Sequence, residues 1–567
     1  MEFKRIIADK IYSSLNGKYL NKREILKLIE QPKDIKNGDF SFPTFILARK
    51  LRQNPKEIAS NIISNINFGP FSKILTAGPY VNFFVPRNKF LNQLLHKVLE
   101  DPTFGENKSG KQGKIAIDMS SPNIAKPMSM GHLRSTVIGE ALSRIARANG
   151  YVPYKINFLG DWGTQFGLMI AAYKLWGNEQ KIKKDPINEL VSLYVKINKK
   201  AENNSSLKEK GRKWFKKLEI GDSEARKLWS WFKDISLSEF QKVYSRLGVT
   251  FNSMNGEAFY NDRMSDVIKL LKDKKLLIKS QGAEIVNLEK LLPNKHIPLA
   301  MIVRSDGATQ YITRDLAAAI YRYEKLHFVS ALYVVGNEQK DHFRQIRAIL
   351  KLAGKNWSDR IEHIGFGLIT VNGKKMSTRK GNVVQLVSVL NKADELAKEQ
   401  IKKKNPHLKN SDKVAREVGT GAVIFNDLQN QRELPINFDL EKIVQFEGNT
   451  GPYVQYTHVR ANSILRKSHI KLNKNQSYKL YDPEAWSIVT KLSQYPQVVV
   501  EAWQSREPGV IAKYLLRLSR EFNTFYGHTK VLVENEAESS RLALVKAVGK
   551  ILQKGLKLLD VHAPLRM

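Results

Sequence analysis

Hydrophobic residues recur along this chain with two spacings, and the spacing changes from one region to the next. Between residues 114 and 163, two strand-like runs, KIAIDMS (114–120) and YKINFLGDWG (154–163), flank the stretch 131–150, whose apolar residues recur three and four positions apart. The short runs predict buried strands, and the longer stretch predicts a helix with one apolar face that stops at Asn149-Gly150. A strand, a helix and a strand in this order predict a parallel sheet with right-handed crossovers.

The pattern divides the chain into three predicted domains. Residues 1–105 mix strand-like runs with helical stretches, one of them over 45–66, and predict a small α+β module. Residues 106–438 predict a Rossmann-type α/β domain with a parallel sheet, interrupted by a charged helical insertion over about 181–247. Residues 439–567 are helical almost throughout and predict an all-α bundle.

Composition narrows the possible functions. The 93 Lys and Arg residues against 55 Asp and Glu give a net charge of +38, which attracts polyanions such as RNA or DNA. A generally basic composition that serves solubility is the alternative. The absence of cysteine excludes disulfides, thiolate zinc sites and cysteine nucleophiles, and favours a reducing compartment. No run approaches the ~20 apolar residues of a membrane span, and the N-terminus lacks a signal-peptide pattern. We expect a cytoplasmic protein without a membrane association.

A rigid polar turn, SSPNIAKPMSMGHLRST (120–136), joins the first predicted strand to the predicted helix. Ligands of parallel sheets bind at such junctions, where the helix N-terminus attracts anions. Gly131 allows a close approach of the backbone, and Lys126 and His132 can donate hydrogen bonds to a phosphate. Taken alone, the turn fits capping and packing by His132 better than a nucleotide site.

A second polar motif, VNGKKMSTRKGN (371–382), follows roughly 240 residues later. A basic loop of this kind can fold over a triphosphate and stabilise the leaving pyrophosphate. As an isolated run it fits an exposed turn better. The combination of the two motifs is much more specific than either one.

Together the two motifs resemble the signatures of the class I aminoacyl-tRNA synthetases, His-x-Gly-His and Lys-Met-Ser-Lys-Ser. More narrowly, the chain resembles the arginyl-tRNA synthetases over its full length. The segments that match this family after the first signature are LGDWGTQFG (159–167), DGATQYITRDLAA (306–318), GNEQKDHF (336–343), TGAVIFNDL (420–428) and FEGNTGPYVQYTHVRANSIL (446–465).

The resemblance implies a two-step reaction that activates L-arginine with ATP and transfers it to the 3′ end of tRNA(Arg), giving AMP and pyrophosphate. Two positions depart from the signatures: Ser129 stands in place of a histidine, and Thr378 in place of a lysine. In the family, a lysine just before the first signature compensates for the latter change, and Lys126 occupies that place. The alternatives are a catalytically inactive tRNA-binding paralogue and another class I synthetase.

The resemblance also implies roles for single residues in phosphate chemistry. The expected ATP-binding residues are Ser129, Gly131, His132, Lys375, Met376 and Ser377. The expected catalytic residues, which stabilise charge on the phosphates, are Lys126, His132, Lys375 and Ser377. No metal site made of protein side chains is expected, because Mg²⁺ arrives with ATP and bridges its phosphates.

An arginine pocket needs carboxylates and planar acceptors, because a guanidinium is a rigid fork of donors. Tyr311 and Asp315 are four residues apart, on one face if the segment is helical. Outside the motif, the alternative is that Asp315 pairs with Arg314 or Arg322 on a solvated face. By the resemblance, the arginine-binding residues are Asp118, Ser121, Asn123, Tyr311, Asp315 and Gln339, with a structural role at the strand end as the alternative for Asp118.

The resemblance places tRNA contacts at both ends of the chain. In the N-terminal module, GPYVNFF matches the D-loop reader, with Tyr80 stacking on a base and Asn82 hydrogen-bonding to it. The alternative for the aromatic residues here is a place in the core. In the bundle, which resembles an anticodon-binding domain, the expected contacts are Tyr453, Tyr456, Arg460 and the terminal Met567, with Gln455 and His458 in the same cluster. The family expectation is a monomer.

Overall fold

The computed structural model describes residues 2–32, 34–371, 374–375, 385–473 and 476–567, and the chain forms two compact units. The first comprises Met1–Phe104, Ala461–Gln497 and Arg520–Ile551, and the second comprises Gly105–Arg460, Val498–Ser519 and Leu552–Met567. Helices that contribute to both units are α19 (Gly451–Lys467), α20 (Pro483–Gln504), α21 (Gly509–His528) and α22 (Ala537–Leu558). The three predicted domain boundaries stay a prediction.

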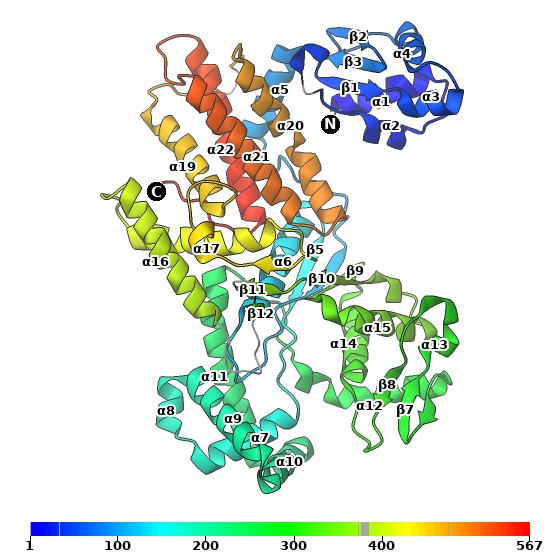
Figure 1. Ribbon diagram of the computed structural model, residues 1–567, viewed down its shortest axis with the longest axis vertical. Coiled ribbons are helices and arrows are strands. Elements are labelled where there is room, and N and C mark those ends of the chain that lie inside the picture. Colours follow the sequence, from blue (N-terminus) through cyan, green and yellow to red (C-terminus); the bar gives the residue numbers. More distant parts are fainter. Residues whose placement is uncertain (1, 33, 372–373, 376–384, 474–475) are drawn as a thin grey trace. The chain divides into compact units, whose positions relative to one another are not determined.

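The first unit contains a three-stranded antiparallel sheet in the order β1-β3-β2, built from β1 (Phe40–Pro43), β2 (Lys73–Ala77) and β3 (Tyr80–Phe84) (Figure 1). Its N-terminal helices are α1 (Glu2–Ser14), α2 (Lys22–Leu28), α3 (Phe45–Leu51), α4 (Pro55–Ser64) and α5 (Arg87–Glu100). The helix predicted over 45–66 is wrong as a single element. It breaks at Arg52, which is left-handed at φ 53°, and restarts where Asn54 caps α4 with Pro55 in its first turn.

The second unit is built on a four-stranded parallel sheet in the order β10-β9-β4-β5 (Figure 1). The strands are β4 (Lys114–Asp118), β5 (Val152–Ile156), β9 (Ser330–Gly336) and β10 (Ile361–Phe366). Asp118, the last residue of β4, stands in register with Ile156 and Tyr333 on the neighbouring strands. The predicted α/β class with its parallel sheet is therefore confirmed.

Helix α6 (Met130–Ala148) connects β4 to β5, as the apolar pattern predicted. It starts after the cap residue Ser129 and ends where the N–H of Asn149 bonds to the carbonyl of Ile145, before Gly150 at φ +80°. The helix is buried on almost every side, which accounts for its many small and apolar residues.

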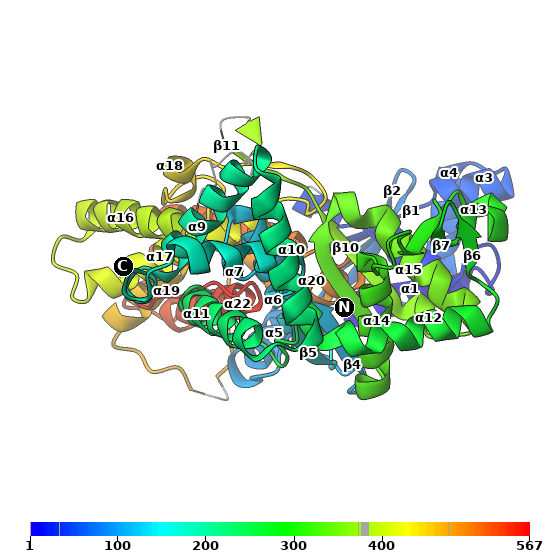
Figure 2. The same cartoon turned by 90° about the horizontal axis from the view of Figure 1, so that it is seen from below.

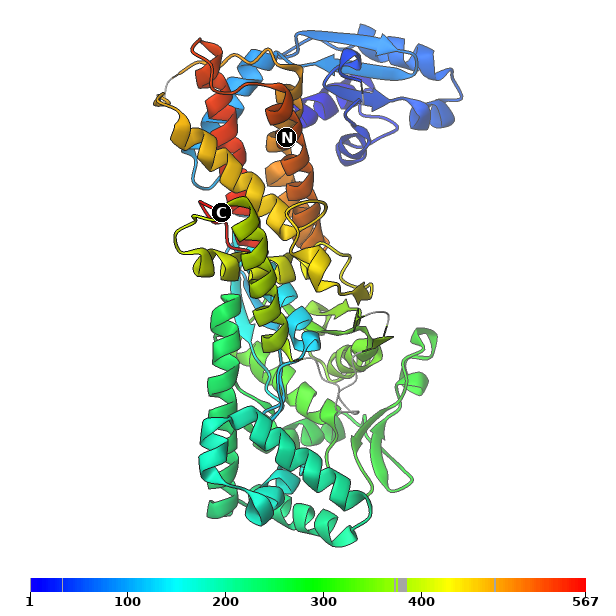
Figure 3. The same cartoon turned by 60° about the vertical axis from the view of Figure 1, so that its left-hand side comes forward.

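The charged insertion forms a group of helices that pack on one another (Figure 2). These are α8 (Glu179–Lys184), α9 (Pro186–Glu202), α10 (Ser205–Ile220) and α11 (Ser223–Leu247), and the last three also pack against α7 (Thr164–Trp176), which precedes the insertion. Figure 3 shows α11, in green, as one long uninterrupted helix.

The remainder of the second unit surrounds the far strands of the sheet and leads into the bundle. Before β9 lie α12 (Met264–Asp273), β6 (Ile278–Ser280), β7 (Ala283–Val286), α13 (Leu288–Leu291), β8 (Ala300–Val303) and α14 (Tyr311–Leu326). After it come α15 (Lys340–Leu352), β11 (Ile369–Val371), β12 (Lys374–Lys375), α16 (Leu386–Lys404), α17 (Ser411–Leu428), β13 (Ile436–Asn437) and α18 (Leu440–Ile443). Among the described helices, none has the length and hydropathy needed to cross a membrane.

Candidate functional site

The loop between β4 and α6 lies at the carboxyl end of the parallel sheet, where the sequence predicted a ligand site. Its backbone is strained, because Ser120 (φ 74°), Ser121 (φ 51°) and Ala125 (φ 59°) all adopt the left-handed region that L-residues disfavour. Asn123 pairs with Gly160 of the GDWG segment in a short parallel bridge, and a side chain at Gly160 would collide with the Asn123 carboxamide. The loop conformation is thus fixed by surrounding groups.

His132 is held as a neutral imidazole at the first turn of α6. Its Nδ1 accepts the backbone N–H of Ser129 at 2.9 Å, so the neutral ring carries its proton on Nε2. Burial, together with the nearby charge of Lys126, lowers the pKa of His132 to about 4. At neutral pH this position offers an uncharged N–H donor beside the helix N-terminus, which suits a phosphate oxygen.

Lys126 lies in the same loop and is partly buried. Its Nζ lies 5.0 Å from the centroid of the Tyr194 ring, and burial lowers the pKa of its ammonium group. The Gly131 backbone, by contrast, is exposed at the start of α6. The structure therefore brings the predicted phosphate-contacting residues Lys126, Ser129, Gly131 and His132 into one turn.

The second motif returns to the first. Lys375 ends the short strand β12, whose backbone pairs with β11, whereas Met376 and Ser377 lie outside the described residues. Where the description resumes, Gln385 forms an antiparallel bridge with Ser129. The adjacent Leu386 N–H donates to the carbonyl of Met128 at 2.9 Å. The chain after the second motif is thus hydrogen-bonded to the residues that open the first.

Asp118 has a partner inside the protein. Arg322 donates from Nη1 to its Oδ2 at 2.7 Å, and Ser121 donates to its Oδ1 at 3.2 Å. Burial raises the pKa of Asp118, and the Arg322 charge opposes that shift. The Arg322 guanidinium also stacks on the rings of Phe158 and Tyr333, at 5.0 and 5.4 Å. These contacts fit the structural role left open for Asp118, and its contact with arginine stays a prediction.

Asp315 lies one helical turn after Tyr311 on α14, so both face the same side. Its Oδ2 is 2.6 Å from Nε2 of His342 on α15. The alternative partners have other contacts, because Arg322 pairs with Asp118 and Arg314 lies 3.7 Å from Glu257.

Tyr311, at the start of α14, is 70% exposed and faces a cleft of about 830 Å³. The cleft is also lined by Trp162, Arg226, Phe259, Arg304 and Arg314. Gln339 is exposed in the turn before α15, three residues before His342.

Glu257 was missed by the sequence reasoning, which found no motif around it. Burial raises the pKa of Glu257 to about 7. The positive charge of Arg314 opposes this rise, whereas the negative charges of Asp315 and Asp161 add to it. Asp161 in turn accepts Lys233 Nζ at 2.8 Å. Carboxylates from separate segments therefore share this region, which suits a cationic substrate group.

In the first unit, Tyr80 and Asn82 are two residues apart on β3. The Tyr80 ring meets Phe45 edge-on with centroids 5.7 Å apart, and Phe45 is 48% exposed. Asn82 is only 3% exposed, and its Oδ1 accepts the Ser41 hydroxyl at 2.6 Å. Tyr80 is placed for stacking, whereas the Asn82 carboxamide oxygen is engaged within the sheet.

On α19, the predicted residues Tyr453, Tyr456 and Arg460 share the more accessible face. The Arg460 guanidinium lies 5.1 Å from the Tyr456 ring centroid. The side chain of Met567 is 8% exposed, and it packs in a core with α16 and α17. Any contact of Met567 with RNA stays a prediction.

Gln455 and His458 are buried on the other side of α19. Gln455 donates to the carbonyl of His562 at 2.7 Å, and His458 Nδ1 lies 3.0 Å from the carbonyl oxygen of Pro564. They hold the C-terminal tail and do not present an RNA surface.

Three family models match successive parts of the chain. They are the class I (R) tRNA synthetase catalytic domain over residues 93–440, the DALR anticodon binding domain over 454–567, and the arginyl-tRNA synthetase N-terminal domain over 2–85. The matches cover the regions where the fold shows the parallel sheet, the helical bundle and the N-terminal α+β sheet.

The chain is similar to known proteins over its whole length. It is 62% identical to the arginine–tRNA ligase of Oenococcus oeni, with 100% of both chains covered, and 54% identical to that of Leuconostoc mesenteroides, with 97% of both covered. The arginyl-tRNA synthetase structure from Plasmodium falciparum has a TM-score of 0.81 at 25% identity, covering 100% of this chain and 98% of that one. That from Thermus thermophilus has a TM-score of 0.82 at 23% identity, with both chains covered completely, and shows the shared fold. Nothing in these similarities supports an inactive paralogue.

Proposed function

We propose how the residues of this chain, which belongs to the arginyl-tRNA synthetases of class I, divide the work of arginine–tRNA ligation. The reaction activates L-arginine with ATP and transfers the arginyl group to tRNA(Arg), releasing pyrophosphate and then AMP. Neither step needs a covalent bond to the enzyme, so the protein positions the reactants and stabilises charge. The observation that carries the assignment is the pairing of Met128 and Ser129 with Gln385 and Leu386, because it ties the start of the first signature to the chain that follows the second motif.

In the first step, an oxygen of the arginine carboxylate attacks the α-phosphorus of ATP, and the bond to the leaving pyrophosphate breaks. His132 donates Nε2–H to a phosphate oxygen, as its occupied Nδ1 requires, and the backbone at Gly131 leaves room for the nucleotide. Lys126 supplies a positive charge from the loop before α6. Lys375, Met376 and Ser377 bring the second signature to the same phosphates.

Mg²⁺ accompanies ATP in this proposal and is held by the phosphates. Among the described residues, no group of three or more His, Asp or Glu side chains is arranged to hold a metal ion. Mg²⁺ that enters with the nucleotide would neutralise charge on the leaving pyrophosphate.

For the amino acid, Asp315 and Tyr311 receive the guanidinium, supported by the exposed Gln339. Ser121 and Asn123 on the strained loop contact the amino and carboxylate groups. Asp118 supports that loop by accepting the Ser121 hydroxyl, and Arg322 in turn binds Asp118. A carboxylate with a fork of donors opposite it is the usual solution for guanidinium recognition.

For the tRNA, Tyr80 stacks on a base of the D-loop, and Asn82 supports the strand that carries it. Tyr453, Tyr456 and Arg460 form the surface for the anticodon side, and Met567 packs beneath Tyr456. We further propose that the protein acts as a monomer in the cytoplasm.

Arginine-dependent exchange of pyrophosphate into ATP, with and without tRNA(Arg), tests the assignment. We expect exchange with arginine alone among the amino acids, and dependence on tRNA, as in other members of the family. Silence under both conditions, with tRNA still bound, would show that Ser129 and Thr378 have cost catalysis and would favour an RNA-binding paralogue.

A further inference from the structure

Helix α11 touches the substrate loops at several points along its length. Its 25 residues span about 37 Å at 1.5 Å per residue. Near its start, Trp229 and Lys233 both bond to Asp161 of the GDWG segment. Further along, the Ser236 hydroxyl accepts the backbone N–H of Ala125 at 2.9 Å. The helix therefore supports two loops of the substrate site.

Tyr244 completes this support at the strained end of β4. Its hydroxyl lies 2.8 Å from the Ser120 hydroxyl and accepts Nδ2 of Asn157 at 2.9 Å. Asn157 in turn accepts the backbone N–H of Ser121 at 3.1 Å. Tyr244 is fully buried, and burial raises its pKa to about 12, so the hydroxyl keeps its proton and can donate. Tyr244 and its amide partner Asn157 thus contact both left-handed residues, alongside the bonds of Ser120 N–H to the Ser135 hydroxyl and of the Ser121 hydroxyl to Asp118.

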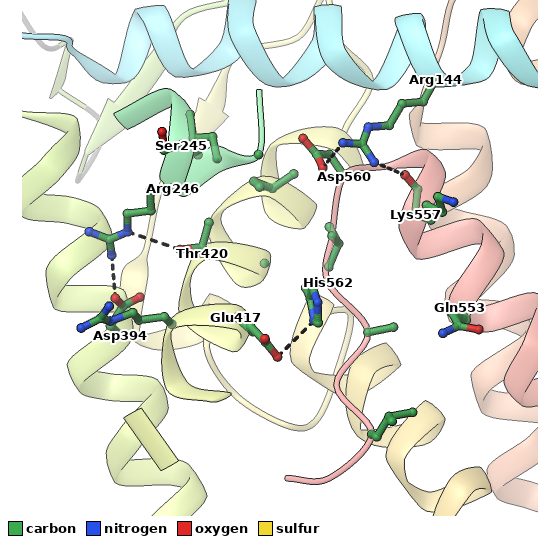
Figure 4. Close-up of a pocket in the computed structure, with 18 of the residues that line it drawn as sticks. Arg144, Ser245, Arg246, Asp394, Glu417, Thr420, Gln553, Lys557, Asp560 and His562 are labelled. Carbon is green, nitrogen blue, oxygen red and sulfur yellow. Dashed lines mark hydrogen bonds and ion pairs between the residues drawn. The ribbon is translucent and has the colours of Figure 1, made fainter. Parts of the chain in front are cut away.

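Two residues later, Arg246 lies on another face of α11 from Tyr244 and contacts α16 and α17. It donates to Asn391 at 2.6 Å and to Asp394 at 2.7 Å on α16, and lies 3.5 Å from the Thr420 hydroxyl on α17. Figure 4 shows the contacts of Arg246 with Asp394 and Thr420 on one wall of a pocket of about 970 Å³ between α11, α16, α17 and the C-terminal tail. The end of α11 is therefore fastened to both helices.

Helices α16 and α17 continue into the region expected to meet the anticodon. One apolar core joins Ala397 and Ile401 of α16 to Val418 of α17 and the terminal Met567, and Tyr456 of α19 packs against it. Residues in such a close-packed core move together. A displacement at Tyr456 would therefore reach Asp394, less than two helical turns before Ile401.

We propose that Tyr244 and Arg246 are positioning residues that couple tRNA binding on α19, through α16 and α17, to arginine binding at the 118–125 loop. When α16 and α17 shift, the contacts of Arg246 shift the end of α11 with them. Tyr244, on the same end of α11, then shifts its contacts with Ser120 and, through Asn157, with Ser121. The strained loop is the responsive part, because a conformation that costs energy depends on the groups that hold it. This inference rests on the proposed tRNA-binding surface.

The coupling is measurable because it is reciprocal: whatever factor tRNA gives to arginine affinity, arginine gives to tRNA affinity. The Kd of tRNA(Arg) is measured by filter binding, with and without saturating arginine and a non-hydrolysable ATP analogue. For the unmodified chain we expect arginine to tighten tRNA binding by about 5- to 150-fold. A factor of one would overturn the proposal.

Arg246→Met removes the contacts with α16 and α17 while keeping an unbranched chain. We expect the factor by which arginine lowers the Kd of tRNA to fall at least fivefold. The Kd of tRNA measured without arginine should change less than twofold. Tyr244→Phe, which loses only the hydroxyl, should lower the same factor, and Arg246→Lys should restore part of it. A normal factor in Arg246→Met would overturn the proposal.

Lys242→Met is the matched control, because Lys242 lies on the same helix, is 70% exposed and pairs only with Glu239 in the contacts described. In Lys242→Met, arginine should lower the Kd of tRNA as much as it does in the unmodified protein. If Arg246→Met does not fold, Asp394→Asn tests the same contact from α16. An unchanged effect of arginine on the Kd of tRNA in Asp394→Asn would also overturn the proposal. Loss of arginine-dependent exchange in the unmodified chain would instead contradict the proposed function itself.

Discussion

Nε2 of His342 lies 2.6 Å from Oδ2 of Asp315, so the carboxylate expected to receive the substrate guanidinium is already oriented by a neighbouring helix. Asp315 lies on α14 and His342 on α15, and both side chains are about three-quarters buried. The pair leaves Oδ1 of Asp315 for a ligand and fixes the plane of the carboxyl group. A preoriented acceptor suits a planar donor such as a guanidinium.

Asp315→Asn should raise the arginine KM by about 10- to 100-fold, because a hydrogen bond to a charged group contributes ~1.5–3 kcal/mol. The KM for ATP should stay the same. Arginine-dependent pyrophosphate exchange, run over a range of arginine concentrations, measures both. His342→Gln is the control, since its amide can still donate to Asp315, and its arginine KM should rise less than about threefold. An unchanged arginine KM in Asp315→Asn would remove Asp315 from the pocket.

The parts of the fold that the sequence predicted are those with strong local patterns. Helix α6 has a cap residue, an apolar periodicity and a stop signal within one stretch, and the structure places its ends within two residues of the expected ones. The break between α3 and α4 was missed because the apolar spacing continues across it. Asn54 and Pro55 carried the signal for that break, because they are typical of a helix start.

The missed parts of the site depend on contacts between distant segments. Arg322 is 204 residues from its partner Asp118, and Tyr244 is 124 residues from Ser120. Within α11 and α14 these residues are spaced like those of any amphipathic helix, so periodicity alone could not distinguish them. The resemblance supplied the residues expected to face the ligands, and the structure shows which other residues contact them.

The neutral state of His132 makes a prediction for the pH dependence of stability. Its pKa is about 4 in the folded protein against an ordinary 6.5, so between these pH values the unfolded chain binds the extra proton. The contribution of neutral His132 to the free energy of unfolding is therefore complete above pH 6.5 and is lost as the pH falls towards 4. His132→Asn cannot take up that proton and should lose less stability than the unmodified protein between pH 7 and pH 5.

Urea unfolding at the two pH values measures this difference, and all other titrating groups cancel between the two proteins. Equal losses of stability in both would mean that His132 is protonated in the folded state at pH 5. In the unmodified protein, we expect the rate of pyrophosphate exchange to show no inflection near pH 6.5 that arises from His132.

Tyr80→Ala should raise the tRNA KM by roughly tenfold, because stacking of a base on an aromatic ring contributes ~1–3 kcal/mol. The arginine KM should not change. Tyr80→Phe keeps the ring and should behave almost as the unmodified protein does. A tRNA KM that stays normal in Tyr80→Ala would contradict the D-loop role.

Asn82→Ala separates binding from folding at the same strand. Its side chain is buried against Ser41, so we expect a raised tRNA KM together with a lower Tm, at a cost of about 1 kcal/mol for the lost hydrogen bond. Ser41→Ala removes the same bond and leaves Asn82 in place. If both variants raise the tRNA KM alike, Asn82 acts by holding the strand and not by contacting a base.

Arg134 links the first signature helix to the base of the second signature. It is fully buried on α6, its Nε lies 3.1 Å from the Asp427 carboxylate, and its Nη1 donates to the carbonyls of Gly367 and Leu434 beside β11 and β13. Burial raises the pKa of Asp427 to about 6, and the Arg134 charge opposes the shift. The pair therefore stabilises the fold only while both members are present.

Asp427→Ala should lower stability by about 3–5 kcal/mol, because it leaves a buried guanidinium without its counter-charge. It should also raise the KM for ATP, since the carbonyls bound by Arg134 flank the hairpin that carries Lys375. The double variant Arg134→Met with Asp427→Leu removes both charges and should be less destabilised than the sum of the single variants Arg134→Met and Asp427→Leu. Urea denaturation of the four proteins gives the interaction free energy. Additive losses would show that the two residues act independently and would contradict the predicted coupling between the two buried charges.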